Sequence, residues 1–105
     1  MNKKFSEAIE ALKQGKRATR LSWSEPGLFI FMQVPSEIKK DIVPKMQSLP
    51  QAVKDEFVKR FIDDRYQLDA IYYNDQIAMV NQSNLIVGYT PSTSDVLSED
   101  WIILD

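Results

Sequence analysis

The C-terminal stretch from Tyr89 to Asp105 contains the pattern best suited to binding an anion. Ser92 and Asp95 have the spacing of a capping box, with Asp in place of the usual Glu. A helix start leaves backbone N–H groups unpaired, and such groups can hold a phosphate. Thr90 and Ser94 add hydroxyls nearby, and Asp95 can accept hydrogen bonds from sugar hydroxyls. A purely structural cap would also explain Ser92 and Asp95, and the two interpretations are compatible.

Two residues nearer the N-terminus, Arg20 and Trp23, have side chains that suit an anionic, aromatic ligand. The forked guanidinium of Arg20 matches the geometry of a phosphate. A salt bridge from Arg20 to Asp95 or Asp100 is an equally good interpretation. Trp23 follows a short predicted strand and lies in a turn. Residue type alone favours a place for Trp23 at one end of the core.

The composition argues against several kinds of enzyme and binding protein. The 105 residues include no Cys and no His, which removes thiol chemistry and the commonest general base and metal ligand. The carboxylate pairs Asp63-Asp64 and Glu99-Asp100 are adjacent, so in a strand their side chains point to opposite faces. We therefore expect no catalytic residue, no metal and no cofactor.

Charge and hydropathy indicate a soluble intracellular protein. The net charge of −2 gives no strong attraction to a DNA or RNA duplex or to a membrane surface. No apolar run approaches the length needed to span a membrane. The N-terminus begins with an amphipathic pattern and not with the apolar block of a signal peptide.

The elements that position these residues predict an α+β fold with a small, mainly antiparallel sheet. One face of an N-terminal helix, closed by Gly15, is marked by apolar residues at helical spacing: Phe5, Ala8, Ile9 and Leu12. Asn2 or Ser6 would cap that helix. Strands are expected at 18–21 and at 28–34, and the second is apolar enough to be central.

The middle of the chain predicts a helical insertion between strands. One short helix is expected from Ser36 through Val43, ended by Pro44, and a second from about 50 to 63. The apolar face of the second consists of Val53, Phe57, Phe61 and Ile62.

The remaining strands complete the expected sheet. Asn74-Asp75 would form a tight hairpin turn between strands 68–73 and 76–80. Strand 85–89 would complete a three-strand meander, and Trp101 would anchor a last strand in the core. We expect residues 1–105 to form one domain.

Two groups of residues, taken together, resemble a known family. The first is FSEAIEALKQGK at 5–16, followed by Arg20 and Trp23. The second runs through Ile77-x-Met79, IVGYTPS at 86–92, DVL at 95–97 and EDW at 99–101. In this order and spacing they resemble the Thoeris anti-defence type two family of phages and bacteria. Tyr89 stands where that family more often has Trp, and the segment from 37 to 65 does not match its consensus.

The resemblance implies a protein that sequesters a nucleotide signal and is not an enzyme. Members of the family bind the cyclic ADP-ribose isomer that a bacterial TIR protein makes during infection, and they do not cleave it. Some also hold cyclic di- or trinucleotides at a separate site. The resemblance further implies a homo-oligomer, a tetramer with nucleotide pockets at subunit interfaces, acting in the cytosol of the bacterial host.

With this resemblance, the candidate residues receive specific expected roles. Trp23 is expected to stack on the base, and Arg20 with the backbone of Thr90–Ser92 to hold phosphate. Asp95 is expected to bind ribose, and Tyr89 to face the pocket or an interface.

Other functions remain open from the sequence. The chief alternative is a protein-interaction module that inhibits a host protein directly through the helix at 50–63. An enzyme built on carboxylates and a stress or toxin-like protein are weaker alternatives.

Overall fold

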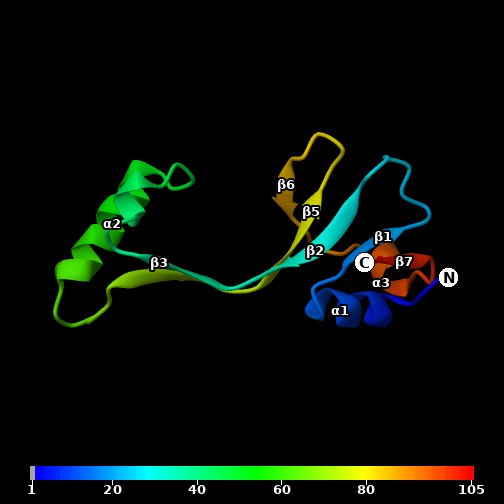
Figure 1. Ribbon diagram of the computed structural model, residues 1–105, viewed down its shortest axis with the longest axis horizontal. Helices are drawn as coiled ribbons and strands as arrows, with labels where there is room; N and C mark the ends of the chain where they lie inside the picture. The colour runs from blue at the N-terminus through cyan, green and yellow to red at the C-terminus, as the bar shows by residue number, and fades with distance from the viewer. Residues whose placement is uncertain (1) are drawn as a thin grey trace. The chain divides into compact units, whose positions relative to one another are not determined.

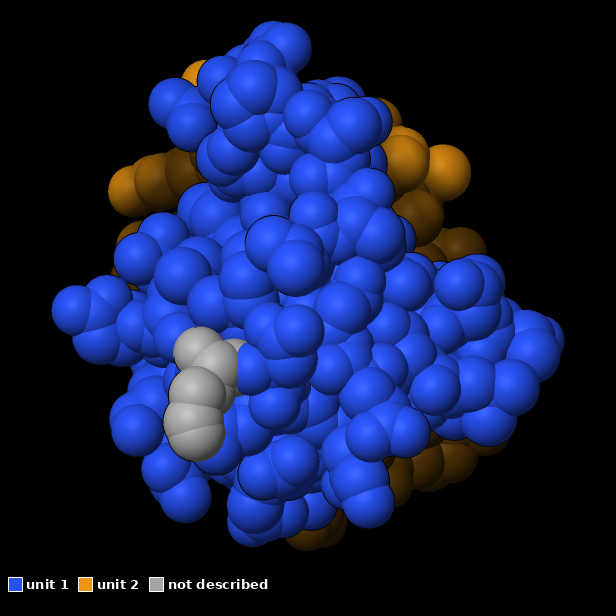
Figure 2. Space-filling model, turned by 90° about the vertical axis from the view of Figure 1, so that its right-hand side faces the viewer, with its two compact units in different colours: residues 1–33, 75–105 blue, residues 34–74 orange. Residues whose placement is uncertain are grey.

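The computed structural model describes residues 2–105, and the chain divides into two compact units. Unit 1 is formed by the chain up to Gln33 and from Asp75 onward, and unit 2 by Val34–Asn74. Figure 1 traces the elements in chain order, and Figure 2 colours the two units separately. The α+β class with an N-terminal helix is confirmed.

Unit 1 is built on a five-stranded antiparallel sheet in the order β6-β5-β2-β1-β7. These strands are β1 (Arg17–Arg20), β2 (Phe29–Gln33), β5 (Gln76–Val80), β6 (Ile86–Gly88) and β7 (Trp101–Leu104). The apolar run of β2 occupies the central position, as its composition predicted.

One face of this sheet carries α1 (Phe5–Lys13) and the core. The fully or nearly fully buried residues of this core are Ala8, Leu12, Ala18, Ile30 and Trp101. Trp101 has no exposed surface, and its ring lies 5.5 Å from that of Phe5. The expected place of Trp101 in the core is confirmed.

The ends of α1 match the sequence in part. Gly15 has φ +86°, the left-handed conformation expected where the helix closes. At the start, neither Asn2 nor Ser6 is the cap: the N–H of Lys4 donates to the carboxylate of Glu7 at 3.0 Å. Glu7 therefore supplies one half of a capping box, because its carboxylate accepts from the N–H of Lys4, the residue before the helix.

The opposite face of the same sheet is half-exposed. Strand alternation places Arg17 and Thr19 of β1 on this face, because Ala18 between them faces the core. Their partners across the ladder are Leu104 and Ile102. Phe29 of β2 joins them, since the adjacent Ile30 is buried.

Unit 2 contains a two-stranded sheet and a helix. β3 (Ser36–Lys39) pairs with β4 (Ala70–Tyr73), and between them come a 3-10 turn, η1 (Val43–Lys45), and α2 (Gln51–Ile62). Its buried apolar residues are Val43, Ala70 and Ile71. The expected helix at 50–63 is confirmed.

The apolar face expected for α2 is only partly correct. Phe57 and Phe61 are half-buried, but Val53 is exposed and Ile62 is 79% exposed. The helix as a whole has no buried residue. The periodicity predicted the helix correctly, but the two-stranded sheet of unit 2 is too small to bury the whole apolar face of α2.

The helix predicted from Ser36 through Val43 is wrong. Ser36–Lys39 is a strand in register with β4, with Ile38 opposite Ile71. Pairing with a neighbouring strand overrides the local capping signal of Ser36. Pro44, expected to end a helix, lies inside the short 3-10 turn instead.

The hairpin predicted at Asn74-Asp75 is also wrong. Both flanking strands exist, but β4 pairs with β3, whereas β5 pairs with β2. The two pairings share one register: Gln33 is opposite Gln76, and three residues on along each strand Ser36 is opposite Tyr73. Pro35 lies between β2 and β3 and has no N–H to donate to a partner strand, and the ladder is interrupted there. Only β5 and β6 form the expected meander.

Candidate ligand-binding site

The predicted helix start at Ser92 is present. α3 (Thr93–Leu97) begins with a full capping box, in which the N–H of Asp95 donates to Ser92 Oγ and the N–H of Ser92 donates to Asp95 Oδ2, both at 3.0 Å. Asp95 is 8% exposed. The structural interpretation of Ser92 and Asp95 is confirmed, and a contact of either residue with ligand stays a prediction.

Asp95 is the centre of a hydrogen-bond network in unit 1. Its carboxylate accepts from Arg20 Nη1 at 2.8 Å and from the Tyr89 hydroxyl at 2.7 Å. Its backbone carbonyl accepts from Trp101 Nε1 at 2.9 Å. Burial alone would raise the pKa of Asp95, but the donors from Ser92, Tyr89 and Arg20 outweigh burial and lower that pKa. The carboxylate is therefore ionised at neutral pH.

Arg20 is held by two carboxylates at once. Its Nε donates to Asp100 Oδ1 at 2.8 Å, and its Nη1 donates to Asp95, which leaves the side chain 10% exposed. Asp100 also accepts from the hydroxyl of Ser98 and from the N–H of Ser22. The hydrogen bond to Asp100 raises the pKa of Arg20, and the same contact lowers the pKa of Asp100. The salt-bridge interpretation of Arg20 is confirmed with both acids.

Trp23 and Tyr89 form an aromatic pair beside this network. The Trp23 ring lies edge-on to Tyr89 at 6.3 Å and to Trp101 at 5.3 Å. Trp23 thus packs against the core, yet it remains partly exposed. Burial, followed by the hydrogen bond to Asp95, raises the pKa of the Tyr89 hydroxyl. Tyr89 is therefore neutral at physiological pH.

The structure joins most of the predicted site residues into one cluster. Contacts link Trp23 to Tyr89, and hydrogen bonds link Tyr89, Arg20 and Ser92 to Asp95. Thr90 is exposed in the loop between Tyr89 and Ser92. The sequence predicted the cap and, as one of two interpretations, the salt bridge of Arg20, but it did not predict the hydrogen bond from Tyr89 to Asp95.

A cavity of about 370 Å³ lies at one edge of the cluster, with Trp23 and Arg20 in its wall. Its volume is within the range of small-molecule sites. The other lining residues come from β1, β2, β7 and the turn between β1 and β2: Arg17, Thr19, Leu21, Ser24, Glu25, Pro26, Gly27, Leu28, Phe29, Ile102 and Leu104. Sequence reasoning missed Arg17 and Phe29. The alternation of short strands was the signal that would have placed them together.

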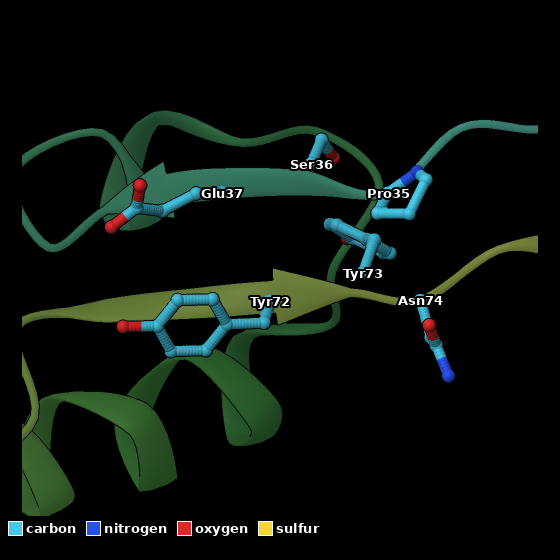
Figure 3. A pocket seen from close by; sticks show the side chains of 6 residues that line it. All are labelled: Pro35, Ser36, Glu37, Tyr72, Tyr73 and Asn74. Atoms are coloured by element: carbon cyan, nitrogen blue, oxygen red, sulfur yellow. The ribbon is translucent and has the colours of Figure 1, made fainter.

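Unit 2 has two hollows of its own. One of about 490 Å³ is lined by residues that begin β3 and end β4: Pro35, Ser36, Glu37, Tyr72, Tyr73 and Asn74. Figure 3 shows these side chains, with Glu37 on one strand and Tyr72 on the other. The second, of about 280 Å³, is mainly apolar and lies between α2 and β4, with Phe57 and Ile71 in its wall.

Metal ligation finds no support in the region that the structure describes. Within residues 2–105, no three or more Asp or Glu side chains gather as a metal site would require. In the same range, no helix is long and apolar enough to cross a membrane.

The fold and the cluster define a small α+β protein whose antiparallel sheet carries an aromatic and ionic site at one end. The family model of the Thoeris anti-defense 2-like domain matches residues 3–104, and the chain belongs to that family. The matched range includes the segment from 37 to 65 that departs from the family motifs. The resemblance noted in the sequence is confirmed.

One similar protein comes from a phage. A relative in Bacillus phage SP01, named Thoeris anti-defense 2, is 28% identical over 100 residues. The match covers 95% of this chain and 92% of the relative.

Proposed function

We propose that this is a phage anti-defence protein that binds a TIR-derived cyclic ADP-ribose signal and holds it without cleaving it. Membership of the family and the name of the phage relative support the anti-defence role. Holding the signal would keep the immune effector inactive. The chemistry of the site supports sequestration in two respects.

The observation that carries the proposal is the position of Trp23. Trp23 is partly exposed and is one of the residues that line a cavity of about 370 Å³, and its ring packs against Trp101 and Tyr89. A rigid aromatic surface in a cavity suits a nucleobase, and base stacking contributes about 1–3 kcal/mol. A ring already held by its neighbours loses little conformational freedom on binding, which favours affinity.

The state of the carboxylates supports binding without cleavage. A general base works best with a pKa near the working pH. The pKa values of Asp95 and Asp100 are instead lowered, and both side chains are tied to Arg20. These acids are suited to holding the site in shape.

We further infer that the protein assembles as a homo-oligomer, a tetramer, in the bacterial cytosol. The half-exposed sheet face with Phe29, Ile102 and Leu104 supports an interface there, as do the exposed apolar residues of unit 2. Cyclic di- or trinucleotides would take a separate site. The hollow lined by Tyr72 and Tyr73 offers aromatic side chains for their bases.

Calorimetry against a panel of cyclic ADP-ribose isomers and cyclic oligonucleotides tests the proposal. Trp23→Phe keeps an aromatic face, whereas Trp23→Leu keeps an apolar side chain without one. We expect the Leu variant to lose roughly 10- to 100-fold in affinity and the Phe variant to lose much less. Ligand released by heating should be chemically intact.

Two results would contradict the proposal. Equal affinity in the Leu and Phe variants would remove Trp23 from the site, provided that both melt at similar temperatures. Recovery of a hydrolysed product would make the protein an enzyme.

A protein-interaction module remains the second candidate, because α2 exposes Val58 and Ile62. This candidate predicts binding to a host polypeptide and no thermal shift with any nucleotide. A ligand at about 100 times its dissociation constant would raise the free energy of unfolding by about 2.7 kcal/mol, which a melting curve detects.

A further inference from the structure

We propose that Arg17, and not Arg20, is the cation that binds phosphate in the cavity shared with Trp23. The inference rests on the proposed function, because it concerns the phosphates of the same nucleotide. It assigns a binding role to a residue outside the motif that marks the family resemblance. Arg17 and Arg20 both line the cavity, and their guanidinium groups differ in how far other partners already engage them.

Arg20 has little capacity left for a ligand. Its Nε and Nη1 donate to Asp100 and Asp95 at 2.8 Å each, and Nη2 makes a longer contact with Asp100 at 3.5 Å. The two acids carry more negative charge than one guanidinium balances. A phosphate approaching Arg20 would meet two carboxylates already occupying its fork, so Arg20 serves as a positioning residue.

Arg17, by contrast, is exposed and only weakly engaged by other side chains. Its side chain is 43% exposed, and its contacts with Asp105 are long, at 3.5 Å and 3.7 Å. Exposed ion pairs of this kind contribute little to stability, so a ligand can replace them at small cost. The guanidinium carbon lies 5.0 Å from the centre of the Phe29 ring. Contact with that ring restrains the guanidinium and leaves its in-plane donors for other partners.

The charged residues of the cavity wall favour Arg17 for this role. Glu25 is the other charged residue of the wall, and its carboxylate accepts from the N–H of Gln82 at 3.0 Å. With Arg20 neutralised by Asp95 and Asp100, Arg17 is the cation in the wall available to balance a phosphate. Trp23 would then stack the base while Arg17 binds the phosphate.

The experiment measures affinity by calorimetry for the cyclic ADP-ribose isomer that binds wild-type protein most tightly, with adenosine as a probe that lacks phosphate. Arg17→Gln should weaken binding of the isomer roughly 10- to 100-fold, as expected for a lost charge-assisted hydrogen bond. Its effect on adenosine should be less than about twofold. Arg17→Lys should recover part of the loss, because it restores charge without the fork.

Lys16→Gln is the matched control, since it removes the same charge from the exposed neighbouring residue. We expect it to bind the isomer within about twofold of wild type. If wild type binds the isomer and Arg17→Gln binds it equally well, the assignment of Arg17 is wrong and the proposed function stands. If Lys16→Gln weakens binding as much as Arg17→Gln, the effect is general charge and the assignment is again wrong. If no isomer binds wild type, the proposed function fails and the assignment fails with it.

Discussion

Asp95 connects β1 with two segments of the C-terminal part of unit 1. Its carboxylate binds Arg20 of β1 and the hydroxyl of Tyr89, while its carbonyl binds the indole of Trp101. A buried carboxylate is tolerated only when its oxygens are satisfied, and here the capping N–H of Ser92 completes the set. The network therefore fixes the position of Tyr89, whose ring packs against Trp23, a residue of the cavity wall.

The second acid of this cluster makes stability depend on pH. The pKa of Asp100 in the folded protein lies below its ordinary value of 3.8, chiefly because Arg20 donates to it. The unfolded chain takes up a proton at higher pH than the folded chain does. The stabilisation is thus complete at neutral pH and is lost as the pH falls below about 4.

We predict that Asp100→Asn lowers the free energy of unfolding by about 1–3 kcal/mol at pH 7, because a charge-assisted hydrogen bond is removed. The difference from wild type should shrink steadily between pH 4 and pH 2. Thermal melts of both proteins across this range measure the effect. Asp41→Asn, at an exposed acid, serves as the control, and a difference for Asp100→Asn that is constant with pH would contradict the assignment.

The sequence predicted the local contacts of the site but not those that depend on strand pairing. The spacing of Ser92 and Asp95 predicted the cap, because capping depends on local geometry. The choice between phosphate and carboxylate partners for Arg20 was not readable, since it depends on a strand pairing that brings β7 beside β1. The place of Arg17 beside Phe29 depends on the pairing of β1 with β2 in the same way.

At the level of elements, α3 owes its position to its first turn. The helix is short, and Ser92 satisfies one of its free N–H groups while Asp95 satisfies the N–H of Ser92. Short helices have little intrinsic stability, so capping and packing decide whether they form.

We expect Ser92→Ala to lower the free energy of unfolding by about 1 kcal/mol, and Ser92→Asp, which keeps an acceptor, to lower it much less. Urea unfolding of the two variants beside wild type measures this. Thr93→Ala, which changes the next hydroxyl residue without removing the cap, is the control. Equal loss in the Ala and Asp variants would show that the side-chain acceptor is unimportant.

Strands with a clear apolar run or a clear boundary were predictable, and those defined by distant partners were not. β2, β5 and β7 lie where the hydrophobic pattern placed them. Ser36 predicts a helix because it has the residue type of a cap, whereas β3 depends on pairing with β4, which lies more than thirty residues away. Asn74-Asp75 has the composition of a tight turn, but β2 and β3 are the partners of its two flanking strands.

At the level of the whole molecule, unit 2 is too small to be well buried by itself. It spans Val34–Asn74 and buries few apolar side chains, whereas Ile62 and Tyr72 are largely exposed. Units of about 40 residues usually need disulfides, metals or association for stability. This chain has no Cys, so no disulfide supplies that stability.

We predict that light scattering on the purified protein gives about four times the chain mass of 12.1 kDa. Ile62→Glu should lower the average mass, because it places a charge on an exposed apolar surface of unit 2. Gln47→Glu, which adds the same charge at an exposed polar position, should leave the mass unchanged. A wild-type mass of one chain would exclude the tetramer.

The common register of β2 with β5 and of β3 with β4 constrains how this chain can change in length. One extra residue on a single side, near Val34 or near Asp75, would move every later side chain of that strand to the other face of its sheet. Side chains that now face solvent would then face the core. Insertions that preserve the pattern must come as even numbers matched on both sides. Length changes that keep the side-chain faces of each strand thus come in steps of about 7 Å, two residues of extended chain.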